Sequence, residues 1–152
     1  MAKRNTSIEE LMEMWSKDSQ INIDNLAIES TQNPALHSKY LNYRTYHNMV
    51  AKAINSEYIE LKKLKTEYYN GLHNTDTEFL QKYKLEPIRN MILKTDIPLY
   101  LESDKDLMPL LLKKIANEEI VSYCDEVIRA IKNRDWSIRN SIDFLKFTNG
   151  MG

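Results

Sequence analysis

Residues 36–71 read LHSKYLNYRTYHNMVAKAINSEYIELKKLKTEYYNG, and this stretch decides the fold. Apolar and aromatic residues recur in it at alternating spacings of three and four, the period of a helix that packs along one stripe. The two stripe positions hold Leu36, Tyr43, Val50, Glu57 and Leu64, and Tyr40, His47, Ile54, Leu61 and Tyr68. Since neither Gly nor Pro interrupts the pattern before Gly71, we predict one helix of about 35 residues.

The predicted helix has recognisable signals at both ends. Asn33 suits an N-cap and Pro34 suits the first helical position, whereas Asn70–Gly71 allows the positive φ that ends a helix. A helix about 50 Å long cannot be buried by a small domain alone. We therefore expect a coiled-coil-like partner, either within the chain or in another copy, with Glu57 as a polar exception on the stripe.

The flanking sequence also predicts helices. Residues 6–18 begin with Ser7 and Glu10 in capping-box spacing and continue as a short amphipathic helix, which packs on the body of the protein or on a partner. Beyond Gly71, Asp76 or Thr77 is expected to cap a helix that ends near residue 85.

The last third of the chain is predicted to hold two further helices. Before them, the sequence IPLYL near residues 96–101 could form a short extended segment instead of a helix. Pro98 would restrict such a segment to the edge of a sheet. Asp106 is the favoured cap of the next helix, and Asp135 is expected to cap a final helix that ends at Gly150.

The composition supports an all-α fold, because three Gly and four Pro are few for the turns of a β protein. We divide the chain into an N-terminal helical region (1–71), a connecting region (72–102) and C-terminal helices (103–152). One cysteine, Cys124, excludes an internal disulfide. No apolar run approaches about 18 residues and the N-terminus lacks a signal-peptide pattern, so we expect a cytoplasmic protein without a membrane partner.

The sequence lacks the groups that an enzyme requires. One Cys and three His have no zinc-site spacing, and there is no glycine-rich phosphate loop, nucleophile elbow or His-Glu-x-x-His motif. Asp104 and Asp106 are interpreted as helix caps, and Cys124 and His47 as core residues. We therefore predict no catalytic residue, no metal and no cofactor.

Positive charge is concentrated in one segment of a chain whose net charge is −1. Residues 33–71 contain six Lys or Arg against three Asp or Glu, a net charge of +3. Lysines neutralise phosphates, and aromatic rings stack on unpaired bases. The candidate nucleic-acid-binding residues are Lys62, Lys63, Lys65, Tyr69 and Arg44. A solvated helix face is the alternative interpretation.

Four segments together resemble the UvsY family of recombination mediator proteins from T-even-like bacteriophages: LHSKYL (36–41), EYYNG (67–71), SDKDL (103–107) and AIKNRDWSIRNSIDFLKFTNG (130–150). Their joint spacing fits the family without gaps from Leu36 to Gly71 and from Leu101 to Gly150, and Cys124 falls on a family cysteine. The resemblance covers most of residues 20–150, and no single motif in it is diagnostic.

The resemblance implies a function. Proteins of this family bind single-stranded DNA and help the phage recombinase displace the single-strand-binding protein, without catalysis of their own. They form ring-like homo-oligomers, here expected to have about six or seven subunits. The implied location is the cytoplasm of the infected bacterial host.

The resemblance also implies residue roles. A basic pair before the Tyr-Tyr contributes to DNA binding in the family, and it matches Lys63 and Lys65; the second position lacks the family's guanidinium. The C-terminal region is the family's oligomerisation element, which implies Trp136, Ile138, Ile142 and Leu145 as interface residues. A non-enzymatic helical adaptor that binds only proteins is the alternative, but it leaves the +3 segment unexplained.

Overall fold

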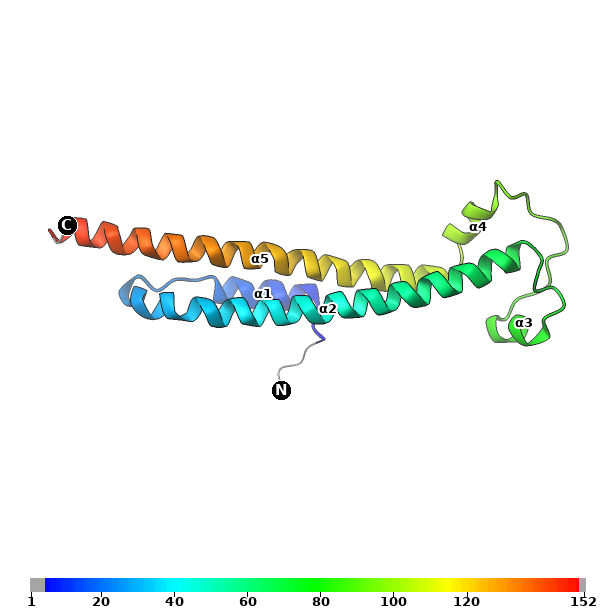
Figure 1. Cartoon of the computed structure of the whole chain (residues 1–152), viewed down its shortest axis with the longest axis horizontal. Helices are drawn as coiled ribbons and strands as arrows, with labels where there is room; N and C mark the ends of the chain where they lie inside the picture. Colours follow the sequence, from blue (N-terminus) through cyan, green and yellow to red (C-terminus); the bar gives the residue numbers. More distant parts are fainter. Residues whose placement is uncertain (1–4, 151–152) are drawn as a thin grey trace. The chain divides into compact units, whose positions relative to one another are not determined.

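The computed structural model describes residues 5–150, and every regular element in that range is helical. The elements are α1 (Ile8–Asp18), the 3-10 helix η1 (Ile23–Asn25), α2 (Leu26–Tyr69), α3 (Thr77–Tyr83), α4 (Ile97–Glu102) and α5 (Leu107–Thr148). Of the described residues, 5–49 and 117–150 form one compact unit, and 50–116 form a second. The long helices α2 and α5 contribute to both units (Figure 1).

The first unit has a core made by α1, α2 and α5, which lie side by side in Figure 1. Leu11 and Tyr40 meet Cys124 there, and Trp15 packs edge-on against Tyr40 with ring centroids 5.5 Å apart. The predicted capping box is confirmed, because the Ser7 side chain accepts from the Glu10 N–H while the Glu10 carboxylate accepts from the Ser7 N–H. The predicted stripe of α2 therefore finds its partner within the chain.

The predicted start of α2 is wrong. The helix begins at Leu26, so Pro34 lies inside it. The Asn22 side chain accepts from the Asp24 N–H and starts η1, which leads directly into α2. Asn33 is buried and accepts a 2.5 Å hydrogen bond from Arg134, so its side chain serves packing between helices instead of capping.

The second unit contains the end of α2, the start of α5 and the short helices α3 and α4. The predicted end of α2 is confirmed at Tyr69, and Gly71 has φ +81°. Asp76 caps α3 as predicted by accepting from the Phe79 N–H. A small core here contains Tyr68, Phe79 and Leu80.

Two further predictions are corrected. The alternative extended segment near 96–101 is a helical turn, α4, because Pro98 sits in its first turn, where a missing N–H costs no hydrogen bond. Asp135 does not cap a final helix, because α5 continues from Leu107 to Thr148. Asp135 instead pairs with Arg139, one turn later, at 3.1 Å.

Candidate nucleic-acid interface

One face of α2 carries exposed lysines in the second unit. Lys52, Ile59 and Lys63 lie on one line along this face, because their spacings of seven and four return to the same side of a helix. All three side chains are exposed. Lys62 is also exposed, and its Nζ lies 5.7 Å from the centre of the Tyr58 ring. Lys62 and Lys63 are thus placed to meet an anion from solvent.

The side chain of Lys65 is buried, which the sequence did not predict. Its side chain is 1% exposed, and its Nζ lies 2.5 Å from Asp106 Oδ2 and 3.2 Å from Asp104 Oδ2. The same ammonium faces the Tyr83 ring at 5.2 Å. Lys63 and Lys65, which the family resemblance implies as a DNA-binding pair, therefore differ in exposure, because positions two apart point to opposite sides of a helix. The role of Lys65 in DNA binding stays a prediction.

Asp104 is the centre of this buried network. Its Oδ1 accepts from the N–H groups of Asp106 and Leu107 and caps α5, while its Oδ2 accepts from the Tyr69 hydroxyl at 2.7 Å. Burial by itself would raise the pKa of Asp104. The three hydrogen bonds and the Lys65 charge outweigh burial and hold the pKa below its ordinary value of 3.8.

Tyr69 is committed to the same network. Its ring is half-buried, with its centroid 5.0 Å from the Tyr68 ring and 5.4 Å from the Tyr100 ring. Burial, followed by the hydrogen bond to Asp104, raises the pKa of its hydroxyl above the usual value of 10.0. Base stacking on Tyr69 stays a prediction, and the ring already packs against two others.

Arg44 belongs to the first unit and has a partner of its own. Its Nε donates to Asp125 Oδ1 at 2.5 Å, and this hydrogen bond raises the pKa of the guanidinium further above its usual value. The side chain is about one-third exposed. A phosphate would have to compete with Asp125 for it, which makes Arg44 a weaker candidate than Lys63.

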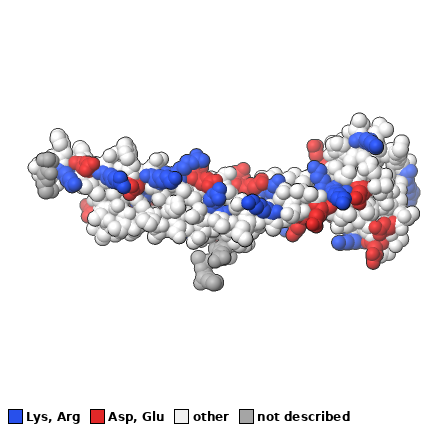
Figure 2. Space-filling view, viewed as in Figure 1, with Lys and Arg blue, Asp and Glu red and all other residues white. Residues whose placement is uncertain are grey.

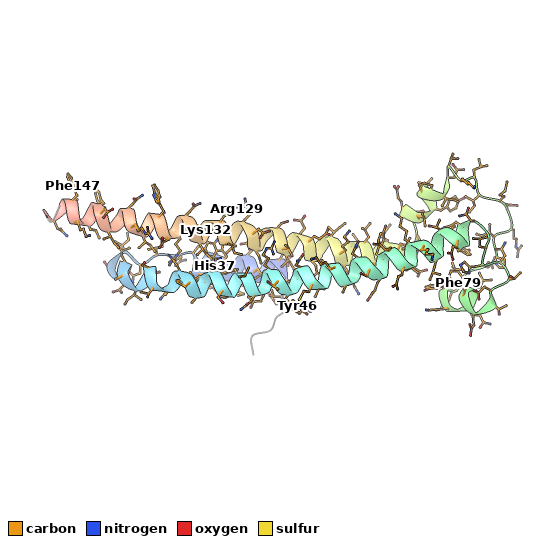
Figure 3. All side chains as sticks on the ribbon, in the orientation of Figure 1. His37, Tyr46, Phe79, Arg129, Lys132 and Phe147 are labelled. Carbon is orange, nitrogen blue, oxygen red and sulfur yellow. The ribbon has the colours of Figure 1, made fainter. Side chains whose placement is uncertain are left out.

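The four predicted interface residues of α5 divide into two kinds. Trp136 is 67% exposed and Leu145 is also exposed, whereas Ile138 is 1% exposed and Ile142 is half-buried. Ile138 therefore packs within its own chain, and its role at a subunit interface stays a prediction. Two further aromatic residues of α5 are exposed, Phe144 and Phe147, and Phe147 lies near the C-terminal end of the helix (Figure 3).

Charge of both signs is spread over the visible surface. On the face in Figure 2, Lys and Arg alternate with Asp and Glu along α5, and large fields of one sign are absent from the described residues on this face. Exposed pairs such as Arg129–Glu126, at 2.7 Å, account for part of this pattern. A nucleic-acid strand on this face would therefore meet short basic clusters instead of one continuous basic groove.

A metal site in the described residues would require a cluster of ligating side chains. Among residues 5–150, no three His, Cys, Asp or Glu side chains are arranged to hold a metal ion. Cys124 is buried as predicted, and burial raises the pKa of its thiol to about 11. None of the helices described in residues 5–150 is long and apolar enough to cross a membrane.

The residues that sequence reasoning missed are the partners of Lys65. Asp104 and Asp106 were interpreted only as helix caps, and Asp104 does cap α5. The sequence did contain a signal for this burial. Lys65 lies three residues before Tyr68, a residue of the apolar stripe, so both side chains lie on the same inward face of the helix. A buried lysine then needs an acidic partner. The corner SDKD supplies two.

Comparison with known proteins agrees with the helical architecture. The family described as "Recombination, repair and ssDNA binding protein UvsY" matches residues 14–151. The recombination protein uvsY of Enterobacteria phage T4 is 24% identical over 143 residues, which cover 94% of this chain and 98% of that protein.

Solved structures of the bacteriophage T4 recombination mediator protein UvsY share the fold. One crystal form has a TM-score of 0.84 at 23% identity and covers 95% of this chain and 99% of that chain. A second has a TM-score of 0.81 at 22% identity, with 94% and 99% covered. With most of its length matched by the family, the chain belongs to the UvsY family of recombination, repair and single-stranded DNA-binding proteins.

Proposed function

We propose that this protein is a recombination mediator of a phage. It binds single-stranded DNA and promotes loading of the phage recombinase onto strands covered by single-strand-binding protein, in the cytoplasm of the infected host. It acts by binding, without catalysis. The observation that carries the proposal is the exposed pair Lys62–Lys63 on α2, in a chain whose family is described as single-stranded DNA-binding.

Electrostatics explains how so few lysines suffice. Each lysine that meets a phosphate releases counterions, which gives affinity that depends on salt and not on base sequence. Lys62 and Lys63 offer one subunit only two such contacts. Repetition around a ring of about six or seven subunits links these weak sites, and linked sites gain avidity.

The exposed end of α5 is the proposed site of assembly. Trp136, Phe144, Leu145 and Phe147 all expose apolar side chains there. Aromatic residues are enriched at interface cores, where they lose water on association. A second copy that covers these side chains would extend the packing of Ile142, which is already half-buried in its own chain.

Strand binding tests the first step. We expect fluorescence anisotropy of a labelled oligo(dT) to report binding at low salt and release as salt rises. Lys62→Gln/Lys63→Gln should weaken binding, with a log–log salt slope less negative by about 0.7 for each phosphate that is no longer neutralised. Lys17→Gln is the control, because Lys17 is also an exposed helix lysine and lies in the first unit.

Recombinase loading tests the second step. Strands are first covered with single-strand-binding protein, and filament formation by the recombinase is then followed with and without this protein. We expect the native chain to shorten the delay before filament growth and Lys62→Gln/Lys63→Gln to shorten it less. A native chain that binds strands but leaves the delay unchanged would contradict the mediator function.

A protein-only adaptor is the second candidate, favoured by the exposed aromatic side chains of α5. Such an adaptor would assemble and bind proteins but would ignore DNA. A native chain that forms oligomers by light scattering, yet leaves oligo(dT) free at low salt, would support the adaptor and contradict the mediator.

A further inference from the structure

We propose that Lys65 supports strand binding without contacting the strand. It is the buried counter-charge of Asp104 and Asp106, and phosphates meet Lys62 and Lys63 instead. This inference rests on the proposed function and assigns a different role to one of the basic residues that the family resemblance placed at the DNA. In this description Lys65 is a positioning residue.

The surroundings of Lys65 leave no room for a phosphate. Its Nζ is held by Asp106 Oδ2 at 2.5 Å and Asp104 Oδ2 at 3.2 Å, and the Tyr83 ring covers it at 5.2 Å. The side chain is 1% exposed. A phosphate contact would require the ammonium to leave both carboxylates, and Asp104 would then remain buried without its counter-charge.

The charge of the cluster matters to its neighbours. The cluster consists of Lys65, Asp104 and Asp106 and carries a net charge of −1. Without the Lys65 charge, its net charge is −2. Lys62 lies one turn before Lys65 on α2, a spacing that places Cβ atoms about 5–6 Å apart. Asp106 is 40% exposed, so its charge reaches solvent. Screening acts over about 10 Å at 0.1 M salt, so a strand at Lys62 would feel the extra negative charge.

The inference therefore predicts a rank order set by cluster charge. Lys65→Met leaves −2 and should weaken binding about three- to tenfold at low salt. Lys65→Met/Asp104→Asn returns the cluster to −1 and should bind like the native chain. Asp106→Asn alone brings the charge to zero and should bind about two- to fivefold more tightly.

The variants are chosen to retain the fold. The amide introduced by Asp104→Asn keeps an Oδ1 that can accept from the N–H groups of Asp106 and Leu107, and Asn caps helices about as well as Asp. Met is close to Lys in length and suits a buried position. Asp106 is partly exposed, so Asp106→Asn makes the mildest change.

The experiment measures oligo(dT) anisotropy across a salt series, with thermal melting by circular dichroism for every variant. Lys63→Gln should make the salt slope less negative by about 0.7, because it removes a phosphate contact. Lys65→Met/Asp104→Asn, whose cluster charge equals the native one, should keep the native slope. A purely structural role for Lys65 would not make Asp106→Asn bind more tightly than the native chain.

Three outcomes overturn the inference. The first is that Lys65→Met/Asp104→Asn stays folded but binds oligo(dT) as weakly as Lys65→Met, with a reduced salt slope. That result would make Lys65 a phosphate ligand. If Lys65→Met does not fold, unchanged or weaker binding by Asp106→Asn refutes the counter-charge role. A native chain that leaves oligo(dT) free at low salt refutes the proposed function, and the inference with it.

Discussion

The ammonium of Lys65 lies 3.2 Å from the carboxylate of Asp104, and neither side chain is accessible to solvent. The pair joins the last turns of α2 to the first turn of α5, because Asp104 also accepts from the Leu107 N–H. A cation that the sequence placed on a binding surface is thus part of the framework beneath that surface. If Lys62 and Lys63 bind the strand as proposed, stability and DNA binding are coupled at this point.

Acid should destabilise the second unit through Asp104. Its pKa is lowered in the folded state, so its ionised form stabilises the fold above the ordinary value of 3.8. This contribution is lost as pH falls through the lower, folded-state value. We expect urea midpoints to drop between pH 5 and pH 3, measured at fixed protein concentration. Asp104→Asn should flatten this dependence, and an equally steep profile in that variant would contradict the assignment.

Loss of Arg134 should destabilise the first unit strongly. Its guanidinium is buried, pairs with Glu29, and donates to Asn33 and to the Gln20 carbonyl oxygen. Arg134→Ala strands the Glu29 carboxylate and should lower the free energy of unfolding by about 3–5 kcal/mol.

The control for Arg134 is Arg129→Ala on the same helix. Arg129 pairs with Glu126 at an exposed site, where ion pairs contribute about 0–1 kcal/mol. Urea unfolding followed by circular dichroism measures both variants. Equal losses in the two would show that burial does not set the strength of the Arg134 network.

Cys124 should resist thiol reagents. It has no exposed surface, and burial raises the pKa of its thiol from 9.0 to about 11. At pH 8 this shift alone lowers the thiolate fraction about a hundredfold, and thiolate is the reactive species. Colour release from an aromatic disulfide reagent should be slow in the native chain and rapid in urea. Complete reaction within the mixing time of the native chain would contradict the buried position.

Trp136 and Ile138 should respond differently to truncation. Trp136→Ala removes an exposed side chain and should lower the oligomer mass in light scattering, with little effect on the helix content of the subunit. Ile138→Ala leaves a cavity and should cost about 2–5 kcal/mol of stability. If Trp136→Ala leaves the mass unchanged at low protein concentration, the assembly site lies elsewhere.

Local sequence signals correctly predicted those helix ends whose capping groups lie close together in the sequence. The capping box at Ser7, the cap at Asp76 and the end of α2 before Gly71 all formed, since each is completed within a few residues. Pro34 and Asp135 also looked like local signals. Neither begins a helix, since α2 and α5 continue through them, and Asn33 and Arg134 beside them are joined by a hydrogen bond between the two helices.

The site was harder to predict than the fold. Lys62, Lys63 and Lys65 are all lysines in one short helical segment. Only the side of the helix on which each lies, relative to Tyr68, separates the exposed pair from the buried residue. Asp104 and Asp106 come from a corner distant in sequence, so their pairing with Lys65 depends on tertiary structure. The burial of Ile138 within its own chain was likewise not predicted, because a helix that is apolar on one face does not reveal which partner covers it.

The two tryptophans give the chain an optical property that follows from their positions. Trp15 is packed against Tyr40, whereas Trp136 projects into solvent. A water-soluble quencher should therefore extinguish the red-shifted part of the emission first, which belongs to Trp136. If subunits associate through α5, that component would shift to the blue and become shielded while the Trp15 emission stays constant. Assembly could then be followed by intrinsic fluorescence, without a dye on the protein.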